Sequence, residues 1–282
     1  MIRGVLGSLC RGAALPLAVV AFALVTGACA LAQAGRADPA LRDILNAPFR
    51  SPEHKARDRY RHPLQTLTFF GLRPDMTVVE LWPFGGWYTE ILAPYLREHG
   101  QLYAAAMDPA STDPEDKEYN RELQAMFAAH PELFGKVHVT VLAPGKMQLA
   151  PDGSADLVLT FRNIHNWVWA GIERDVFAAA FRALKPGGIL GVVEHRSNDP
   201  NLIPKQGEAY VGEAYAVHLI ESVGFRLVAR SNVNRNPKDT KDYPKGVWTL
   251  PPIYAEGSKD RAKYAAIGES DRFTLKFVKP RG

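Results

Sequence analysis

Cysteine is scarce in this chain. Its 282 residues include two cysteines, Cys10 and Cys29, and both lie in the first 34 residues. Residues 35–282 therefore contain no thiol, which excludes a disulfide, a catalytic thiolate and a cysteine-bound metal from that part of the chain. A large excess of one charge is also missing. Without Arg3 and Arg11, the charged residues of the first 34, 32 of the 34 basic residues remain against 30 acidic ones. This small surplus does not predict binding to nucleic acid.

The first 34 residues have the composition of an export signal. They contain two arginines, no acidic residue, an apolar run over 13–25 and small residues before Ala34. This pattern predicts a cleaved secretory signal peptide, because the apolar run is too short for a transmembrane domain. We expect cleavage after Ala34 and a periplasmic or secreted protein. An alternative is a lipid anchor at Cys29, because residues 26–29, TGAC, resemble a bacterial lipobox.

Apolar runs and helical patterns alternate over the rest of the chain. This alternation predicts an α/β fold with a doubly wound, mostly parallel seven-stranded sheet and helices on both faces. The predicted strands are 77–82, 101–106, 137–142, 156–161, 188–194, 225–231 and 272–279. The predicted helices are 87–98, 115–129, 172–184 and 206–223, with a further helical stretch within 53–72.

Residues 35–282 predict a single domain, since about 250 residues can bury one large core. We expect residues 35–57, which are polar and contain Pro48 and Pro52, to be an extended lead-in. Residues 232–271 form an insertion between the last two predicted strands and are rich in Asn, Lys, Asp, Pro and Gly. Two strands joined by such a connection pair antiparallel more easily than parallel, so the last strand is expected to be antiparallel.

Residues 77–89, TVVELWPFGGWYT, predict a strand, a turn with glycines and the start of a helix. Such a unit places backbone N–H groups at the carboxyl edge of a sheet, where nucleotide-like ligands bind. Glu80 closes this strand, and Asp108 follows the next one 28 residues later. Together they indicate ligand contact, although either acid alone would as readily cap a helix.

A second polar cluster follows the strand predicted at 156–161. Arg162, Asn163 and His165 lie there with Trp167, at the edge where catalytic groups collect in open α/β sheets. The pKa of a histidine lies near neutrality, so His165 is a candidate proton acceptor. Alternatively, it is bonded to nearby backbone. The histidines of the chain have no metal-binding spacing, so we predict no metal site.

The turn at 80–86 resembles motif I of class I S-adenosylmethionine (SAM) dependent methyltransferases, E/D-x-G-x-G-x-G. Glu80, Trp82, Phe84 and Gly86 are in register with it, and only the last glycine of the motif is present. The resemblance implies SAM as the cofactor. It implies that Asp108 binds the ribose hydroxyls and that Glu80 holds the turn or the methionine ammonium. The implied cofactor-binding residues are Glu80, Trp82, Gly85, Gly86 and Asp108.

The resemblance extends over residues 58–280. Within the superfamily the sequence is most similar to a group of exported bacterial methyltransferases. That similarity rests on Trp82 with Pro83, on residues 85–92 (GGWYTEIL), on residues 162–167 (RNIHNW) and on residues 271–273 (DRF). It implies that substrate-facing residues, with Arg162, Asn163 and His165 as the catalytic candidates, follow the fourth strand.

We therefore expect SAM-dependent methyl transfer to an unidentified small-molecule acceptor. Export is an objection, because SAM is made in the cytosol and a permanent cation crosses a bilayer at high cost. The alternative is an exported, non-catalytic small-ligand-binding protein on a methyltransferase scaffold, in which the Phe84 ring fills part of a degenerate SAM pocket. A third reading is an enzyme of different chemistry on the same scaffold.

Overall fold

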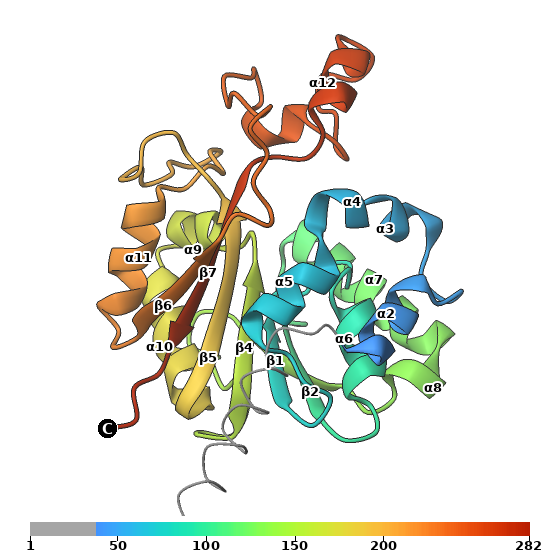
Figure 1. Cartoon of the computed structure of the whole chain (residues 1–282), viewed down its shortest axis with the longest axis vertical. Helices are drawn as coiled ribbons and strands as arrows, with labels where there is room; N and C mark the ends of the chain where they lie inside the picture. The colour runs from blue at the N-terminus through green and yellow to red at the C-terminus, as the bar shows by residue number, and fades with distance from the viewer. Residues whose placement is uncertain (1–37) are drawn as a thin grey trace, which may run out of the picture. The chain divides into compact units, whose positions relative to one another are not determined.

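Seven strands form one mixed sheet in the order β3-β2-β1-β4-β5-β7-β6 (Figure 1). The computed structural model describes residues 38–282. The predictions of cleavage after Ala34 and of lipidation at Cys29 lie outside the described residues. The strands are β1 (Thr77–Leu81), β2 (Gln101–Ala106), β3 (His138–Val141), β4 (Ala155–Phe161), β5 (Leu184–His195), β6 (Arg226–Ser231) and β7 (Arg272–Val278). The predicted doubly wound sheet with an antiparallel last strand is confirmed.

The register brings the ends of the central strands together. In β1, Glu80 pairs with Ala104 of β2 on one side and with Leu159 of β4 on the other, and both pairings are parallel. β5 is parallel to β4, whereas β7 runs against β5 and pairs Arg272 with His195. The carboxyl ends of β1, β2, β4 and β5 and the start of β7 therefore lie at one edge of the sheet.

Helices cover both faces because each inner strand points alternate apolar side chains to opposite sides. Val78 packs on the face covered by α2, α5 and α6, and Val79 packs on the face covered by α9, α10 and α11. The helices are α2 (Pro39–Asn46), α3 (Pro52–Ala56), α4 (Asp58–Arg61), α5 (Pro63–Phe70), α6 (Thr89–Leu96), α7 (Pro114–Ala129), α8 (Pro131–Phe134), α9 (Ile164–Ala170), α10 (Glu173–Ala183), α11 (Glu213–Glu221) and α12 (Arg261–Ile267).

The extended lead-in predicted over 35–57 is wrong for its described part, which contains α2 and α3. The side chain of Asp38 accepts a hydrogen bond from the Ala40 N–H, and that of Ser51 accepts one from the His54 N–H. A proline follows each cap. Proline is favourable at the first position of a helix, where its missing N–H has no partner to lose. Each proline thus starts a helix here instead of preventing one.

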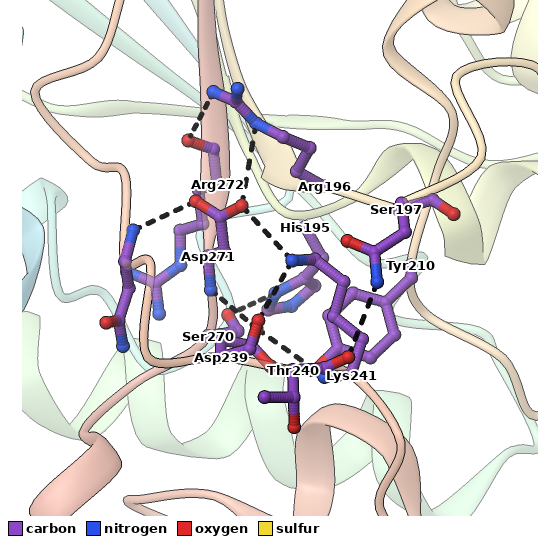
Figure 2. Close-up of polar contacts among 12 residues, drawn as sticks. His195, Arg196, Ser197, Tyr210, Asp239, Thr240, Lys241, Ser270, Asp271 and Arg272 are labelled. Atoms are coloured by element: carbon purple, nitrogen blue, oxygen red, sulfur yellow. Dashed lines mark hydrogen bonds and ion pairs between the residues drawn. The ribbon is translucent and has the colours of Figure 1, made fainter.

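Residues 232–271 connect β6 to β7 and contain a short 3-10 helix, η1 (Gly246–Thr249), and α12 (Figure 1). A buried network fixes this connection beside the end of β5 (Figure 2). Asp239 accepts hydrogen bonds from the Tyr210 hydroxyl at 2.9 Å and from the Asp271 N–H at 2.7 Å. The start of β7 is thereby held next to His195. Within residues 38–282, no helix is both long and apolar enough to cross a membrane.

Candidate functional site

The turn between β1 and α6 has an unusual backbone. Trp82, Phe84 and Gly86 have positive φ angles of 44°, 49° and 77°. This region costs a residue with a Cβ roughly 1 kcal/mol, so the two aromatic residues are held there by their surroundings. The Trp82 indole N–H donates to the Leu142 carbonyl at 2.9 Å, and the Phe84 ring lies 4.7 Å from that of Tyr119. At Gly86 an added Cβ would lie 2.4 Å from the Met126 methyl carbon, so α7 approaches the turn closely.

Glu80 is a buried acid at the end of β1. Its side chain accepts a hydrogen bond from the Thr89 hydroxyl at 2.6 Å, which ties the strand to the first turn of α6. The residue is 2% exposed. Burial raises the pKa of its carboxyl to about 7, and the Thr89 hydrogen bond opposes that rise. At a pH near this value, a cationic neighbour would therefore shift the group most strongly toward its ionised form.

Asp108, the acid after β2, is paired within the protein. Its carboxylate lies 2.6 Å from the Lys146 ammonium and accepts the Ala110 N–H at 3.0 Å. Lys146 lowers the pKa of Asp108. Asp108 does not line the cavity described next, although its neighbour Met107 does. Because the Lys146 side chain is 55% exposed, the ion pair is of the surface kind, and solvent screens it.

A cavity of about 920 Å³ opens at the edge where the strands end. Of the predicted cofactor residues, Glu80, Trp82 and Gly85 line it, whereas Gly86 and Asp108 do not. Of the predicted catalytic residues, Arg162 and His165 line it. Its volume is in the range of cavities that hold small organic ligands.

Asn163 connects two strands by hydrogen bonds and does not line the cavity. It is fully buried, and its amide N–H group donates to the Leu81 carbonyl at 2.8 Å and to the Thr160 hydroxyl at 3.2 Å. These bonds join the end of β4 to the end of β1. Asn163 therefore has a structural role in this arrangement, because its amide N–H group is engaged inside the protein, while its Oδ1 is buried without a hydrogen bond.

His165 belongs to a buried cluster on α9 and β5. Its Nδ1 lies 3.2 Å from a Glu194 carboxylate oxygen, and the Nδ1 of His195 lies 2.6 Å from the Ser270 hydroxyl. Both imidazoles line the cavity. Burial, followed by the charges of His165 and Arg272, keeps the pKa of His195 well below its usual value, so His195 is neutral near pH 7.

His165, Glu194 and His195 each place a ligand-type atom within 4.8 Å of the others, which sequence spacing did not predict. Glu194 is committed elsewhere, because its oxygens accept the backbone N–H groups of Ile164 at 2.6 Å and His195 at 2.7 Å. The carboxylate thus orients His165 and leaves two imidazoles as ligands. The absence of a metal site stays a prediction.

Four arginines that the sequence did not single out as a group also meet at the cavity. Arg57, Arg61, Arg162 and Arg272 line it together with Glu269. Arg61 is 3% exposed, and Glu194 and His195 at the end of β5 are buried as well. No local pattern predicts that the four arginines meet Glu269, because Arg57 and Glu269 are 212 residues apart in the chain.

Aromatic rings form the remaining walls. Tyr88 stacks on Phe161 with ring centroids 3.5 Å apart, and Trp169 lies 6.0 Å from Trp248. All four residues line the cavity. Apolar walls with a few converging polar groups are the usual construction of a site for a small organic ligand.

Comparisons with known proteins agree with this architecture. No family model matches the chain, and no curated protein matches its sequence. Among solved structures, a SAM-dependent methyltransferase from Aquifex aeolicus is 18% identical and aligns over 86% of this chain and 100% of its own, with a TM-score of 0.54. The 4+2 cyclase SpnF is 16% identical over 84% of this chain and 86% of its own, with a TM-score of 0.55. A SAM-dependent methyltransferase from Methanosarcina mazei is 15% identical over 75% of this chain and 95% of its own, with a TM-score of 0.50. At these identities the likeness shows the fold, which is that of class I methyltransferases.

Proposed function

We propose that this protein is a SAM-dependent methyltransferase that acts on a small-molecule acceptor. One observation carries the proposal: a single cavity joins Glu80 at the end of β1 with His165 beyond the end of β4. The two sides have complementary chemistry, because Glu80 offers negative charge and His165 offers a base. The names of two structures that share the fold support the same activity.

The residues at the turn fit the cofactor. Glu80 would sit beside the cationic part of SAM, and Trp82 and Gly85 would line its binding site. Asp108 would bind the ribose hydroxyls after releasing Lys146, which costs little because the pair is a surface one. When bound, SAM supplies a methyl group on a sulfonium sulfur, and that sulfur keeps the electron pair of the broken bond.

The protein's own contribution is alignment and proton transfer. His165 is oriented by the Glu194 carboxylate, so its ring can take the proton from an acceptor hydroxyl or amine at the Nε2 atom. The aromatic walls exclude water from the reacting groups. An in-line displacement needs little more than this positioning.

Binding of S-adenosylhomocysteine to the purified chain, measured by calorimetry, tests the proposal. We expect saturable binding, and we expect Asp108→Asn to weaken it about tenfold because a charge-assisted hydrogen bond is lost. Lys146→Gln is the matched control, because it breaks the same ion pair and leaves the acid free. No binding at millimolar ligand, or equal weakening by both variants, would contradict the proposal.

The alternative of a non-catalytic binding protein has one observation in its favour. Phe84 and Trp82 fill the turn with rings where the motif has glycine, and the Phe84 ring lines the cavity. The cyclase that shares the fold supports the third reading, different chemistry on this scaffold.

We further propose that the chain is exported, and that it belongs with the exported bacterial group that it resembles. The composition of residues 1–34 supports export, and residues 85–92, 162–167 and 271–273 support the similarity to that group. A reporter fused to residues 1–40 should leave the cytosol. A fusion that stays there would contradict export and would remove the objection from SAM supply.

A further inference from the structure

Four guanidinium groups face the cavity from three separate parts of the chain. Arg57 and Arg61 come from the segment of α3 and α4, Arg162 from the junction of β4 and α9, and Arg272 from the start of β7. We call these four residues the arginine cluster. Arg162 and Arg272 lie at the β4, β5 and β7 side of the sheet edge, whereas Glu80 and Met107 line the cavity at the β1 and β2 side. Arg61 also lies over the Trp87 ring in the turn after β1, 4.5 Å from its centroid.

A single carboxylate, that of Glu269, is in contact with this cluster. Arg57 Nε lies 2.5 Å from one of its oxygens and Arg61 Nε 3.5 Å from the other, and Arg272 Nη2 donates to it as well. These contacts enclose the Glu269 side chain, which is 1% exposed. One negative charge thus faces four positive ones.

Arg272 Nη1 donates to the Tyr60 carbonyl at 3.5 Å, but other donors of the cluster have no partner among residues 38–282. Arg61 Nη1 and Arg272 Nε are buried without a hydrogen bond. The Arg162 guanidinium makes no hydrogen bond and no ion pair with any described residue, and its backbone has a φ of 64°. Arg61 and Arg272 are buried with donors that no protein group accepts, which is costly, whereas Arg162 is half-buried and its unpaired guanidinium lines the cavity.

The positive charges of the cluster repel one another, and this repulsion acts on the pKa of Arg162. Burial, together with Arg272 and Arg57, lowers the pKa of Arg162 to about 10. An anion placed among these groups would cancel the repulsion and satisfy the free donors. A metal cation at the adjacent His165 and His195 would add to the repulsion instead.

We propose that the methyl acceptor is an organic acid whose oxyanion, a carboxylate or a phosphate, is bound by Arg162 together with Arg61 and Arg272. The identification of this acid as the methyl acceptor rests on the proposed function, but the anion site itself does not. Arg162 precedes His165 by three residues, so an acid held there would present its hydroxyl or amine to the imidazole. The aromatic walls at Tyr88 and Phe161 suit an acid with an apolar or aromatic body.

A second source of the same chemistry is the methionine carboxylate of the cofactor. The probes that separate the two are benzoate and phenyl phosphate, with neutral benzamide as their control, and S-adenosylhomocysteine, with 5′-methylthioadenosine as the analogue that lacks the carboxylate. The variants are Arg162→Gln and Arg162→Lys. Arg59→Gln is the matched control, because Arg59 lies between Arg57 and Arg61 on the chain but is exposed and outside the cavity.

We expect the purified chain to bind at least one of the two anions more tightly than benzamide, by about tenfold, since charge-assisted hydrogen bonds replace neutral ones. Arg162→Gln should remove that preference, Arg162→Lys should keep part of it, and Arg59→Gln should leave it unchanged. Thermal unfolding of each variant shows whether it is folded, and affinity for S-adenosylhomocysteine should not change in any of them.

Three results would overturn the inference. The first is the absence of any anion preference in the parent protein, and the second is a preference that survives Arg162→Gln. The third is a loss of affinity in Arg162→Gln for S-adenosylhomocysteine but not for methylthioadenosine, which would assign the cluster to the cofactor. If instead the anions bind through Arg162 and S-adenosylhomocysteine does not bind at all, the methyltransferase proposal fails while the anion site stands.

Discussion

At the scale of single residues, the buried acid Glu80 makes stability depend on pH. The folded protein raises the pKa of this acid from 4.5 to about 7 by burial. Between those two pH values the folded state binds more protons than the unfolded state, so the free energy of unfolding falls as pH rises and is level above about pH 7. A shift of this size corresponds to about 3 kcal/mol.

Glu80→Gln should remove this pH dependence, because glutamine stays neutral and still offers an oxygen to Thr89. We expect the free energy of unfolding of the variant, relative to that of the parent, to rise by about 3 kcal/mol from pH 5 to pH 8. Urea unfolding of both proteins at pH 5 and at pH 8 measures this difference. The comparison cancels the contributions of all other titrating groups, which the two proteins share. Parallel pH profiles would show that the carboxyl titrates normally in the folded protein.

At the scale of elements, the turn from β1 to α6 decides how much of the cavity beside it is open. Phe84 has a φ of 49° and its ring packs on Tyr119. Phe84→Gly relieves the backbone strain, about 1 kcal/mol, and opens the space that the ring fills. We expect affinity for S-adenosylhomocysteine, measured by calorimetry, to rise several-fold.

Phe84→Ala is the control for this change, because it opens the same space but keeps a Cβ at positive φ. Greater affinity in both variants would show that the ring occludes ligand, and greater affinity in glycine alone would assign the effect to the backbone. Equal affinity in all three proteins would place the ring outside the nucleoside site and count against the degenerate-pocket alternative.

The sequence predicted elements better than it predicted where they start. β2 spans the predicted residues 101–106, because Gly100 precedes its apolar run and Asp108 follows the run closely. The helix predicted over 206–223 is shorter, and α11 begins at Glu213. Residues before it form a loop that contains Gly207 at a φ of 83°. α9 was not predicted, because seven residues give too little periodicity to distinguish a short helix from a loop.

The residues that line the site also divide into those that the sequence predicted and those that it did not. The sequence predicted that Glu80, Trp82, Gly85, Arg162 and His165 lie at the site because each lies at or soon after the end of a strand, and strand ends in a parallel sheet share one edge. Asn163 follows the same strand but turns inward. Arg61 and Glu269 were missed because their meeting depends on how α4 and the β6–β7 connection pack, which no local spacing encodes.

At the scale of the whole molecule, Glu269 joins the two ends of the described chain. Its carboxylate contacts Arg57 and Arg61 on the N-terminal side, more than 200 residues away, and Arg272 beside it. Those arginines hold the pKa of Glu269 well below its usual value. Glu269→Gln should therefore cost about 3–5 kcal/mol, because it leaves a set of buried cations without a carboxylate.

An oxyanion in solution should reverse part of that loss. If the cluster is an anion site, sulfate will raise the melting temperature of Glu269→Gln more than that of the parent protein, since it stabilises the folded state by binding to it alone. Chloride at equal ionic strength separates binding from screening. Glu256→Gln, a change on the same connection outside the cluster, should respond to sulfate only as much as the parent protein does. Equal effects of sulfate and chloride on Glu269→Gln would mean that the guanidinium groups repel one another without forming a place for an anion, and the acceptor would then have to be sought among neutral molecules.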